Sequence, residues 1–334
     1  MHREAERNNL KLVCVVKDWD WPDILRQTPG GKGVWDGLHF STDAVECDAL
    51  VILNNRLKRE VRATCPKENV WALMQEPYVR GFTDWMVEGH VPFAHVLTSH
   101  PADSSEKYVL SQPAVPWHVN HTFDQLTTID IPDKSRPLSW VVGNCKDLPG
   151  HMDRFAFLKT LQCTSDIPAD LFGRAVRPIE DKWDGLAPYR FSLAIENTVS
   201  TDYWTEKIAD CFLSWTVPIY HGCPNLANYF PQESYVHIDI RRPAEALAAI
   251  RKVLNEDALE WKRRLPALVE ARRRVLYEYQ LFPHLTRMLR RKARQDGNRD
   301  CITIPPYRRS LKAGLWRRIS KAKMSIKRLA GAND

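Results

Sequence analysis

Short, continuous apolar runs rich in Val, Ile and Leu recur along this chain, and they restrict its fold more than any other feature. In the first half the runs are Leu10–Val16, Ala49–Asn54, Val70–Met74 and His95–Thr98. In the second half they are Leu138–Val142, Ala169–Phe172, Phe191–Ile195, Thr216–Tyr220 and Tyr235–Ile238. Continuous rather than alternating apolar runs are typical of strands buried on both faces of a parallel sheet. Because helical stretches lie between several of them, the sequence predicts an α/β fold.

The chain is long enough for two such units, since a single hydrophobic core seldom extends beyond about 250–300 residues and this chain has 334. A proline-rich stretch, Pro113–Pro137, separates the two sets of runs. We therefore expect two Rossmann-like domains followed by C-terminal helices. The expected bounds are residues 1–130, residues 131–300 and, for a basic amphipathic tail, residues 301–334.

The net charge of +7 is concentrated near the C-terminus. Nine Lys or Arg residues and no acidic residue lie between Arg308 and Arg328, and subtracting these nine charges from +7 leaves −2 for the rest of the chain. The body of the protein therefore lacks the excess of positive charge that is typical of nucleic-acid-binding domains. We expect no nucleic-acid partner.

Eight cysteines are spread along the chain without any C-x-x-C spacing, and most lie in or beside apolar segments. This distribution favours buried free thiols over a disulfide framework or a zinc site. No apolar run approaches the roughly 20 residues of a membrane span, and Met1–Asn9 has neither the apolar core nor the cleavage site of a signal peptide. The sequence therefore predicts a cytoplasmic protein.

The segment Phe191–Gly222 contains the densest functional signal. A predicted strand ends at Ile195, and ligands of open α/β sheets bind at the carboxyl ends of strands. The helix that follows has Glu206 and Lys207 in its first turn. Its apolar positions, spaced as one core-facing stripe, are Ile208, Cys211, Phe212 and Trp215.

This helix N-terminus presents unpaired N–H groups and a partial positive charge, to which Lys207 adds a full charge. Together they predict a binding site for a diphosphate, and Glu206 could accept hydrogen bonds from ribose hydroxyls. An ordinary strand–helix connection with a solvated Glu–Lys pair is the alternative.

The string ENTVSTDYWTEK, followed by TVPIYHGCPNLANYFP and SYVHIDI, resembles the donor-binding signature of glycosyltransferase family 10, the α1,3/α1,4-fucosyltransferases. That family has E-N-S, a short gap, Y-x-T-E-K, a helix, a G-x-V-P-V-type strand and an F-I-H-V-D-like strand. The resemblance implies a GT-B-like fold. It also implies an enzyme that transfers L-fucose from GDP-fucose, with inversion, to a hydroxyl of a glycan acceptor, in an α1,3 linkage to GlcNAc or a similar sugar.

The same resemblance identifies residues that would hold the donor. It puts Asn197, Tyr203, Glu206 and Lys207 in the donor pocket, with Lys207 at the pyrophosphate and Glu206 at the ribose. The upstream string SWVVGNCKDLPGHMDRFAFLKTL resembles the family's strand, loop and helix with a phosphate-binding Arg, and Arg154 occupies that position. The alternative for Arg154 is a solvated helix residue.

Two further strings bear on the site. DLFGR at residues 170–174 resembles the family's D-x-Y-G strand end, where Gly173 would permit a close approach of backbone. Asp18-Trp19-Asp20 has the spelling of a metal-binding Asp-x-Asp motif, but it lies far from the donor signature in the sequence. Because Arg154, Lys207 and the helix N-terminus supply positive charge, we expect no cofactor and no structural need for a divalent cation.

An inverting transfer also needs a base that takes the proton of the acceptor hydroxyl. Glu76 follows the predicted strand Val70–Met74 and resembles the family's catalytic Glu, which stands in a comparable E-N or E-S-P context. Here the neighbours are Gln75 and Tyr78. A structural carboxylate paired with Arg80 is the alternative.

The C-terminal region has a helical pattern from Pro243 to about Gln295, with breaks expected at Pro266 and Pro283. In the tail, apolar residues recur every three or four positions at Leu311, Leu315, Ile319, Ala322, Ile326 and Leu329. Lys and Arg cover the other face, a pattern typical of a helix on an anionic membrane surface. A solvated charged helix or an RNA-binding tail are the alternatives. We expect a peripheral protein on the inner face of the membrane that modifies a lipid-linked or surface glycan such as lipopolysaccharide.

Two other functions remain compatible with the sequence. One is the same fold with a different nucleotide-sugar donor, because no identified residue recognises the 6-methyl group of fucose. The other is a protein that binds a nucleotide sugar or a nucleic acid without catalysis. A transfer assay beside a binding assay separates these possibilities.

Overall fold

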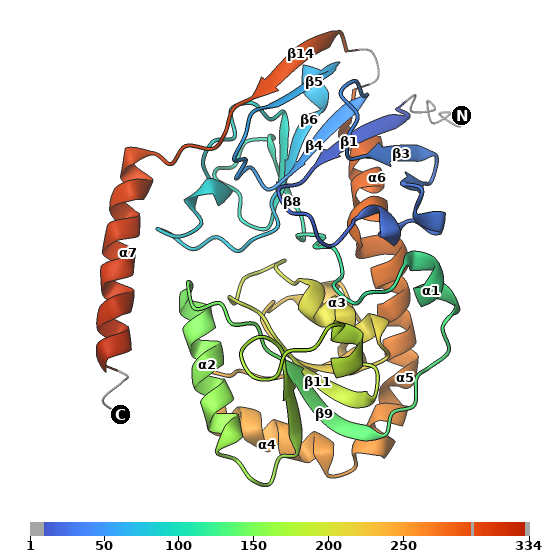
Figure 1. Ribbon diagram of the computed structural model, residues 1–334, viewed down its shortest axis with the longest axis vertical. Helices are drawn as coiled ribbons and strands as arrows, with labels where there is room; N and C mark the ends of the chain where they lie inside the picture. Colours follow the sequence, from blue (N-terminus) through green and yellow to red (C-terminus); the bar gives the residue numbers. More distant parts are fainter. Residues whose placement is uncertain (1–9, 295–296, 331–334) are drawn as a thin grey trace. The chain divides into compact units, whose positions relative to one another are not determined.

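The computed structural model describes residues 10–294 and 297–330, and the chain divides into two compact units (Figure 1). Unit 1 contains Met1–Ala114 and Leu281–Asp334, and unit 2 contains Val115–Gln280. Each unit is built on a mainly parallel sheet with helices. The predicted α/β class is therefore confirmed. Every strand that the apolar runs predict is present, with ends that differ by a few residues at most.

Unit 1 contains a sheet of seven strands among its described residues. In spatial order these are β2 (Val34–Trp35), β3 (Leu38–Ser41), β1 (Leu12–Val16), β4 (Ala49–Leu53), β6 (Val70–Leu73), β7 (His95–Thr98) and β8 (Tyr108–Leu110). Neighbouring strands are parallel, except that β2 and β3 form an antiparallel hairpin. All five residues of β4 are buried, as expected for a central strand with both faces covered.

One face of this sheet is covered by α6 (Leu281–Lys292). Its buried residues Leu281, Phe282, Leu285 and Leu289 join the core beneath β1 and β4. The rings of Phe282 and Phe40 make an edge-to-face contact, with their centroids 5.0 Å apart. The chain therefore returns to unit 1 at Leu281, whereas the sequence suggested a domain boundary at residue 300. The apolar face of α6 requires this return, because it would otherwise be exposed to water.

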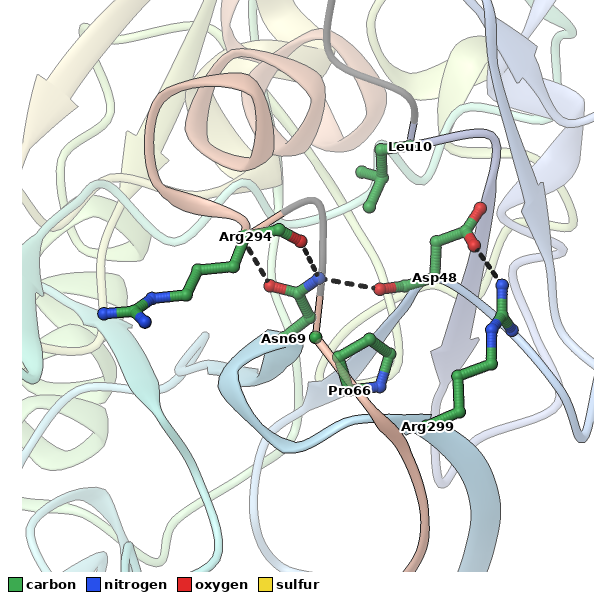
Figure 2. A pocket seen from close by; sticks show the side chains of 7 residues that line it. Leu10, Asp48, Pro66, Asn69, Arg294 and Arg299 are labelled. Carbon is green, nitrogen blue, oxygen red and sulfur yellow. Dashed lines mark hydrogen bonds and ion pairs between the residues drawn. The ribbon is translucent and has the colours of Figure 1, made fainter.

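The last part of the chain also belongs to unit 1. Strand β14 (Arg299–Ile304) pairs antiparallel with β5 (Val61–Pro66). Figure 2 shows two contacts that hold this part of the chain against unit 1. The Asn69 side chain donates to the Arg294 carbonyl at 2.8 Å, and Arg299 forms an ion pair with Asp48 at 2.5 Å. The small pocket drawn there contains structural contacts and no residue of the donor signature. Helix α7 (Leu311–Ala330) follows.

Unit 2 contains a five-stranded, fully parallel sheet. In spatial order its strands are β10 (Ala169–Phe172), β9 (Arg136–Val141), β11 (Tyr189–Ile195), β12 (Val217–His221) and β13 (Val236–His237). Its helices are α1 (Phe123–Thr128), α2 (Pro149–Gln162), α3 (Glu206–Leu213), α4 (Pro243–Leu254), α5 (Asp257–Arg274) and a π-helical turn at Val275–Tyr279.

Two local expectations were wrong. Pro266 lies inside α5 without ending it, because buried residues on both sides, Trp261 and Leu268, hold the helix against the unit 2 core. All eight cysteines are free as predicted, but Cys145, Cys163 and Cys301 are exposed rather than buried. These three lie in a loop, after the end of α2 and in the two-stranded ribbon, where apolar neighbours in the sequence do not ensure burial.

Candidate functional site

The candidate site lies at the carboxyl end of β11, the central strand of the unit 2 sheet. The strand ends at Ile195, and Glu196 and Asn197 follow directly. After a loop, α3 begins at Glu206 with Thr205 as its N-cap, whose side chain accepts a bond from the Lys207 backbone. The core-facing stripe of α3 is buried as predicted, although the helix ends before Trp215, which follows in a left-handed conformation.

An ion cluster forms around Lys207, in which Glu196 is buried and Lys207 and Glu206 are partly buried. Its Nζ lies 3.2 Å from Glu196 Oε2, 3.3 Å from Glu206 Oε1 and 3.0 Å from Thr205 Oγ1. The Thr205 backbone N–H also donates to Glu196 at 2.8 Å, so the carboxylate is held on two sides. Lys207 is therefore not part of a solvated surface pair.

The pKa values in this cluster follow from burial and pairing. Burial lowers the pKa of Lys207, but the carboxylates of Glu196 and Glu206 outweigh it and raise the pKa above its usual value. Burial raises the pKa of Glu206, but Lys207, His118 and Lys182 outweigh it and lower the pKa below its usual range. Glu206 and Lys207 are therefore held in their charged forms.

Two side chains that are far from α3 in the sequence, Lys182 and His118, also act on Glu206. Lys182 Nζ lies 2.7 Å from the fully buried Asp210 Oδ2 on α3. The other oxygen of Asp210 accepts a bond from the His118 backbone at 2.9 Å. Burial also lowers the pKa of His118. His118 and Lys182 lie far from α3 in the sequence, and a buried Asp on the apolar side of α3 is the one signal that points to them.

Arg154, on α2, is 5% exposed and is therefore not a solvated helix residue. Its guanidinium donates to Asn197 Oδ1 at 3.0 Å and to the carbonyls of Gly143 and Cys145 at 3.3 Å each. These acceptors are neutral, and the buried Nε has no hydrogen-bond partner among the described residues. Burial lowers the pKa of Arg154. The cation is thus fixed in place without a bonded counterion.

The N-terminus of α2 lies beside the same loop. A Cβ added to Gly150 would lie 2.0 Å from the Asn197 carbonyl oxygen, so only glycine permits this approach. The adjacent His151 is buried, and burial together with the charges of Arg154 and Lys207 lowers its pKa to about 4. Two helix N-termini, those of α2 and α3, therefore flank Glu196 and Asn197. Positive helix ends in this position favour an anion.

The remaining residues that the sequence predicts in the donor pocket lie in or beside the loop between β11 and α3. Asn197 is half-buried and bonded to Arg154, whereas Tyr203 is 1% exposed. Asp202 fixes the loop, since its carboxylate accepts bonds from Asn225 at 2.7 Å and Tyr229 at 2.8 Å. The structure thus brings Arg154 to Asn197 and Glu206 to Lys207 as directly bonded pairs.

Glu76 belongs to unit 1 and is exposed just beyond β6. Its neighbour Gln75 is buried and donates to the carbonyls of Pro113 and Ala114 at 3.1 Å each. The backbone before Glu76 is therefore fixed, and Glu76 itself is an exposed residue. Its role as a base stays a prediction.

Two further predictions concern metal and backbone geometry. Within residues 10–294 and 297–330, no group of three or more His, Cys, Asp or Glu residues is arranged to hold a metal ion. Asp18 and Asp20 lie in the loop after β1. The close approach predicted at Gly173 is confirmed, because an added Cβ would lie 2.3 Å from the Val142 carbonyl oxygen.

Comparisons with known proteins relate part of the chain to a family of glycosyltransferases. Residues 131–275 match the profile described as "Glycosyltransferase family 10 (fucosyltransferase) C-term". The chain is 28% identical over 135 residues to 4-galactosyl-N-acetylglucosaminide 3-alpha-L-fucosyltransferase FUT6 of Pongo pygmaeus, covering 39% of this chain and 36% of the relative. It is 32% identical over 171 residues to alpha-(1,3)-fucosyltransferase 7 of Homo sapiens, covering 47% and 48%. The chain thus spans about a third to a half of the length of these relatives.

A crystal structure of an α1,3-fucosyltransferase is similar over most of its length. The TM-score is 0.50 at 18% identity, and the match covers 89% of this chain and 94% of that chain. At this identity the similarity concerns the fold. The predicted GT-B-like α/β fold with Rossmann-like domains is confirmed.

Proposed function

Because the domain formed by residues 131–275 belongs to glycosyltransferase family 10, we propose that the chain transfers L-fucose from GDP-fucose to a hydroxyl of a glycan acceptor, with inversion. The observation that carries this proposal is Arg154, a buried cation bonded to neutral acceptors beside two helix N-termini. Such a site suits the diphosphate of a nucleotide sugar.

The chemistry requires stabilisation of the leaving group. As the bond between fucose and phosphate breaks, negative charge grows on GDP while the sugar gains oxocarbenium character. Fixed donors at that position lower the barrier, and one such contact is often worth about 2.7–4 kcal/mol. Arg154, Lys207 and the N-termini of α2 and α3 would supply them, so we propose that catalysis needs no divalent cation.

We propose that the nucleoside and the sugar of the donor contact the remaining predicted residues of the site. Glu206, held ionised by its neighbours, would accept hydrogen bonds from the ribose hydroxyls. Asn197 orients Arg154 through their 3.0 Å bond, and Tyr203 would support the donor from the loop before α3. Donor specificity for fucose is inferred from the family.

On the acceptor side, we propose Glu76 as the general base. Glu76 is an exposed residue, and the chain before it is anchored through Gln75. It would take the proton of the acceptor hydroxyl as that oxygen attacks the sugar on the face opposite GDP. The acceptor proposed is an oligosaccharide or lipid-linked glycan, with an α1,3 linkage to GlcNAc or a similar sugar, because the named relatives are α1,3-fucosyltransferases.

The deciding experiment is a transfer assay with GDP-fucose and a galactosyl-N-acetylglucosaminide acceptor in the presence of EDTA. Parallel reactions with GDP-mannose and UDP-sugars test the donor. Glu76→Gln should lower kcat by a factor of about 10²–10⁴ and leave the Kd for GDP unchanged, whereas Glu68→Gln provides a matched control before β6. Absence of fucosyl transfer by the folded wild-type protein would contradict the proposal.

We also propose that α7 binds an anionic membrane surface, which would place the enzyme peripherally on its inner face. Leu311, Leu315, Ile319 and Ile326 are exposed on this helix, and Lys and Arg residues flank them. The side chains of Lys327 and Leu329, which extend this pattern, lie outside the described residues. Across the described part of the chain, no helix has the length and apolarity needed to cross a membrane.

A vesicle sedimentation assay tests this surface. The wild-type protein should bind phosphatidylglycerol vesicles and not phosphatidylcholine vesicles. Replacing Leu315 and Ile319 by Glu should release it, because each change removes apolar contact and adds repulsion. Equal binding to both lipids, or binding that survives the double substitution, would refute the membrane role.

A further inference from the structure

The segment Tyr307–Ser320, here called the docked segment, is bonded to Arg80–Glu88, here called the acceptor-side segment because it follows Glu76. Ser310 Oγ donates to Glu88 Oε1 at 2.7 Å, and the Tyr307 hydroxyl donates to Glu88 Oε2 at 3.2 Å. The Tyr307 backbone N–H also donates to the Leu57 carbonyl at 3.1 Å. The chain is therefore tied down where it enters α7.

A charged contact continues this attachment. Arg309 Nε lies 3.7 Å from Asp84 Oδ2, and Asp84 is 4% exposed. The other carboxylate oxygen of Asp84 accepts the Gly81 backbone N–H at 2.8 Å. Because Asp84 also shapes the turn at Gly81, the Arg309 contact acts on the conformation of the acceptor-side segment itself.

The closest approach occurs about two to three turns further along the chain, at Trp316 and Ser320 on α7. Gly81 has φ +83, and a Cβ there would lie 2.8 Å from the Trp316 carbonyl oxygen and 2.5 Å from Ser320 Oγ. The Arg80 guanidinium lies 4.8 Å from the centre of the Trp316 ring. Ser320 Oγ donates to the Arg80 carbonyl at 3.2 Å. Gly81 therefore serves as a docking point for the helix backbone.

The face of α7 that docks differs from its apolar stripe. Ala313, which is 3% exposed, lies on the same face as Trp316 and Ser320. The exposed residues of the stripe belong to another face, centred roughly 130° away around a helix of 3.6 residues per turn: Leu311, Leu315, Ile319 and Ile326. The helix can thus present its apolar stripe outward while the opposite face holds the acceptor-side segment.

We infer that Trp316 and Ser320 are positioning residues: by docking on Arg80 and Gly81 they fix the segment that follows Glu76 and so support acceptor use. This inference rests on the proposed function in one respect, the role of Glu76. The contacts themselves lie within unit 1.

Amide hydrogen exchange on the full-length protein measures the docking directly. Trp316→Ala should speed exchange of the amides of residues 79–88 about tenfold, because it removes a cation–aromatic contact from a locally opening segment. Trp316→Phe keeps an aromatic ring and should restore most of the protection. Ser320→Ala and Ser325→Ala form a matched pair on α7, and only Ser320→Ala should increase exchange.

Kinetics then separate positioning from mere docking. Trp316→Ala should lower kcat/KM for the acceptor about tenfold, in step with the exchange rate, while the Kd for GDP stays at the wild-type value. Trp316→Phe should recover acceptor use, and Ser325→Ala should behave as wild type. The pattern of acceptor loss without donor loss is not expected from general destabilisation.

Two outcomes would overturn the inference. If exchange at residues 79–88 is the same in Trp316→Ala and Ser325→Ala, the docking does not order the segment. If exchange increases but acceptor kcat/KM does not change, the docking exists without a positioning role. Should the wild-type protein transfer no fucose at all, the proposed function fails and the positioning role with it, whereas the exchange result still reports on the docking alone.

Discussion

Replacing Lys207 by Ala should have two separable effects, because its ammonium does two things in the structure. It lies 3.2 Å from Glu196, whose side chain is completely buried, and 3.3 Å from Glu206. It is also the cation at the N-terminus of α3 that would contact the diphosphate. The substitution removes the partner of a buried carboxylate and, at the same time, the proposed contact with the ligand.

The loss of the ion pair with Glu196 determines how much the substitution destabilises the protein. Breaking a buried pair by removing one partner costs about 3–5 kcal/mol, which for a unit of this size lowers Tm by roughly 6–20 °C. The loss of the proposed contact between Lys207 and GDP should have a smaller effect, and this effect is on GDP affinity. A hydrogen bond to a charged group is worth about 1.5–3 kcal/mol, which corresponds to a roughly 10- to 150-fold weaker Kd for GDP.

The stability loss should depend on pH. Burial raises the pKa of Glu196 and Lys207 opposes that shift, so the variant should have a still higher pKa at Glu196. An acid with a raised folded-state pKa binds more protons when folded than when unfolded, and stability falls as pH rises through the interval between the two values. Lys207→Ala should therefore recover stability on acidification from pH 8 towards the unfolded-state pKa of about 4.3.

A second substitution separates the two effects. Glu196→Gln added to Lys207→Ala removes the unpaired charge and should recover most of the Tm without recovering GDP affinity. Thermal unfolding and calorimetric titration with GDP measure both, and Lys262→Ala, an exposed lysine on α5, is the control. A Lys207→Ala protein that melts and binds GDP like the wild type would refute the reasoning, as would a double variant with restored GDP affinity.

Four further predictions follow from individual contacts. Arg154→Met should weaken GDP binding by a factor of roughly 10–150 with little loss of Tm, because its partners are neutral; a large loss of Tm with unchanged Kd would contradict a phosphate role. Gly150→Ala should destabilise the protein by about 1–3 kcal/mol in denaturant unfolding, since its Cβ would lie 2.0 Å from the Asn197 oxygen. Lys134 donates to the Ser214 carbonyl at 2.7 Å, and burial lowers the pKa of Lys134 well below its usual value. The wild type should therefore gain stability relative to Lys134→Met as the pH rises towards 10.5. A stability difference that does not change with pH would contradict this. GDP affinity should fall less than tenfold between 50 and 500 mM salt, because buried charges are weakly screened, and a steeper fall would indicate an exposed site.

The sequence predicted the strands for a clear physical reason, whereas the donor signature was identified by its resemblance to a family. A strand buried on both faces has to be apolar throughout, so β4, β6 and β11 are visible as continuous runs. The amphipathic spacing of α3 likewise placed Glu206 and Lys207 at its start. These features are local, and local patterns need no knowledge of distant residues.

The rest of the site depends on contacts between distant parts of the chain. Lys182 and His118 meet Asp210 only after the sheet of unit 2 has formed, and no spacing rule connects them. Glu196 directly follows a predicted strand, and only the structure shows that its buried carboxylate pairs with Lys207. In unit 1, β14 was missed because a two-stranded ribbon with one exposed face lacks a continuous apolar run.

The charges of the donor site suggest how it would hold a diphosphate without a metal ion. Two carboxylates, Glu196 and Glu206, balance the cations Lys207 and Arg154, so these four side chains carry no net charge in their ionised forms. Attraction to an anion must then come from the arrangement of the donors: the guanidinium is bonded to neutral oxygens, and both helices begin beside the same loop. Carboxylates that hold Lys207 in place also prevent it from relaxing when charge develops on the leaving group. A preorganised arrangement of this kind stabilises a transition state more than a mobile cation would, which is why we expect the buried acids to matter for catalysis although they would repel the donor.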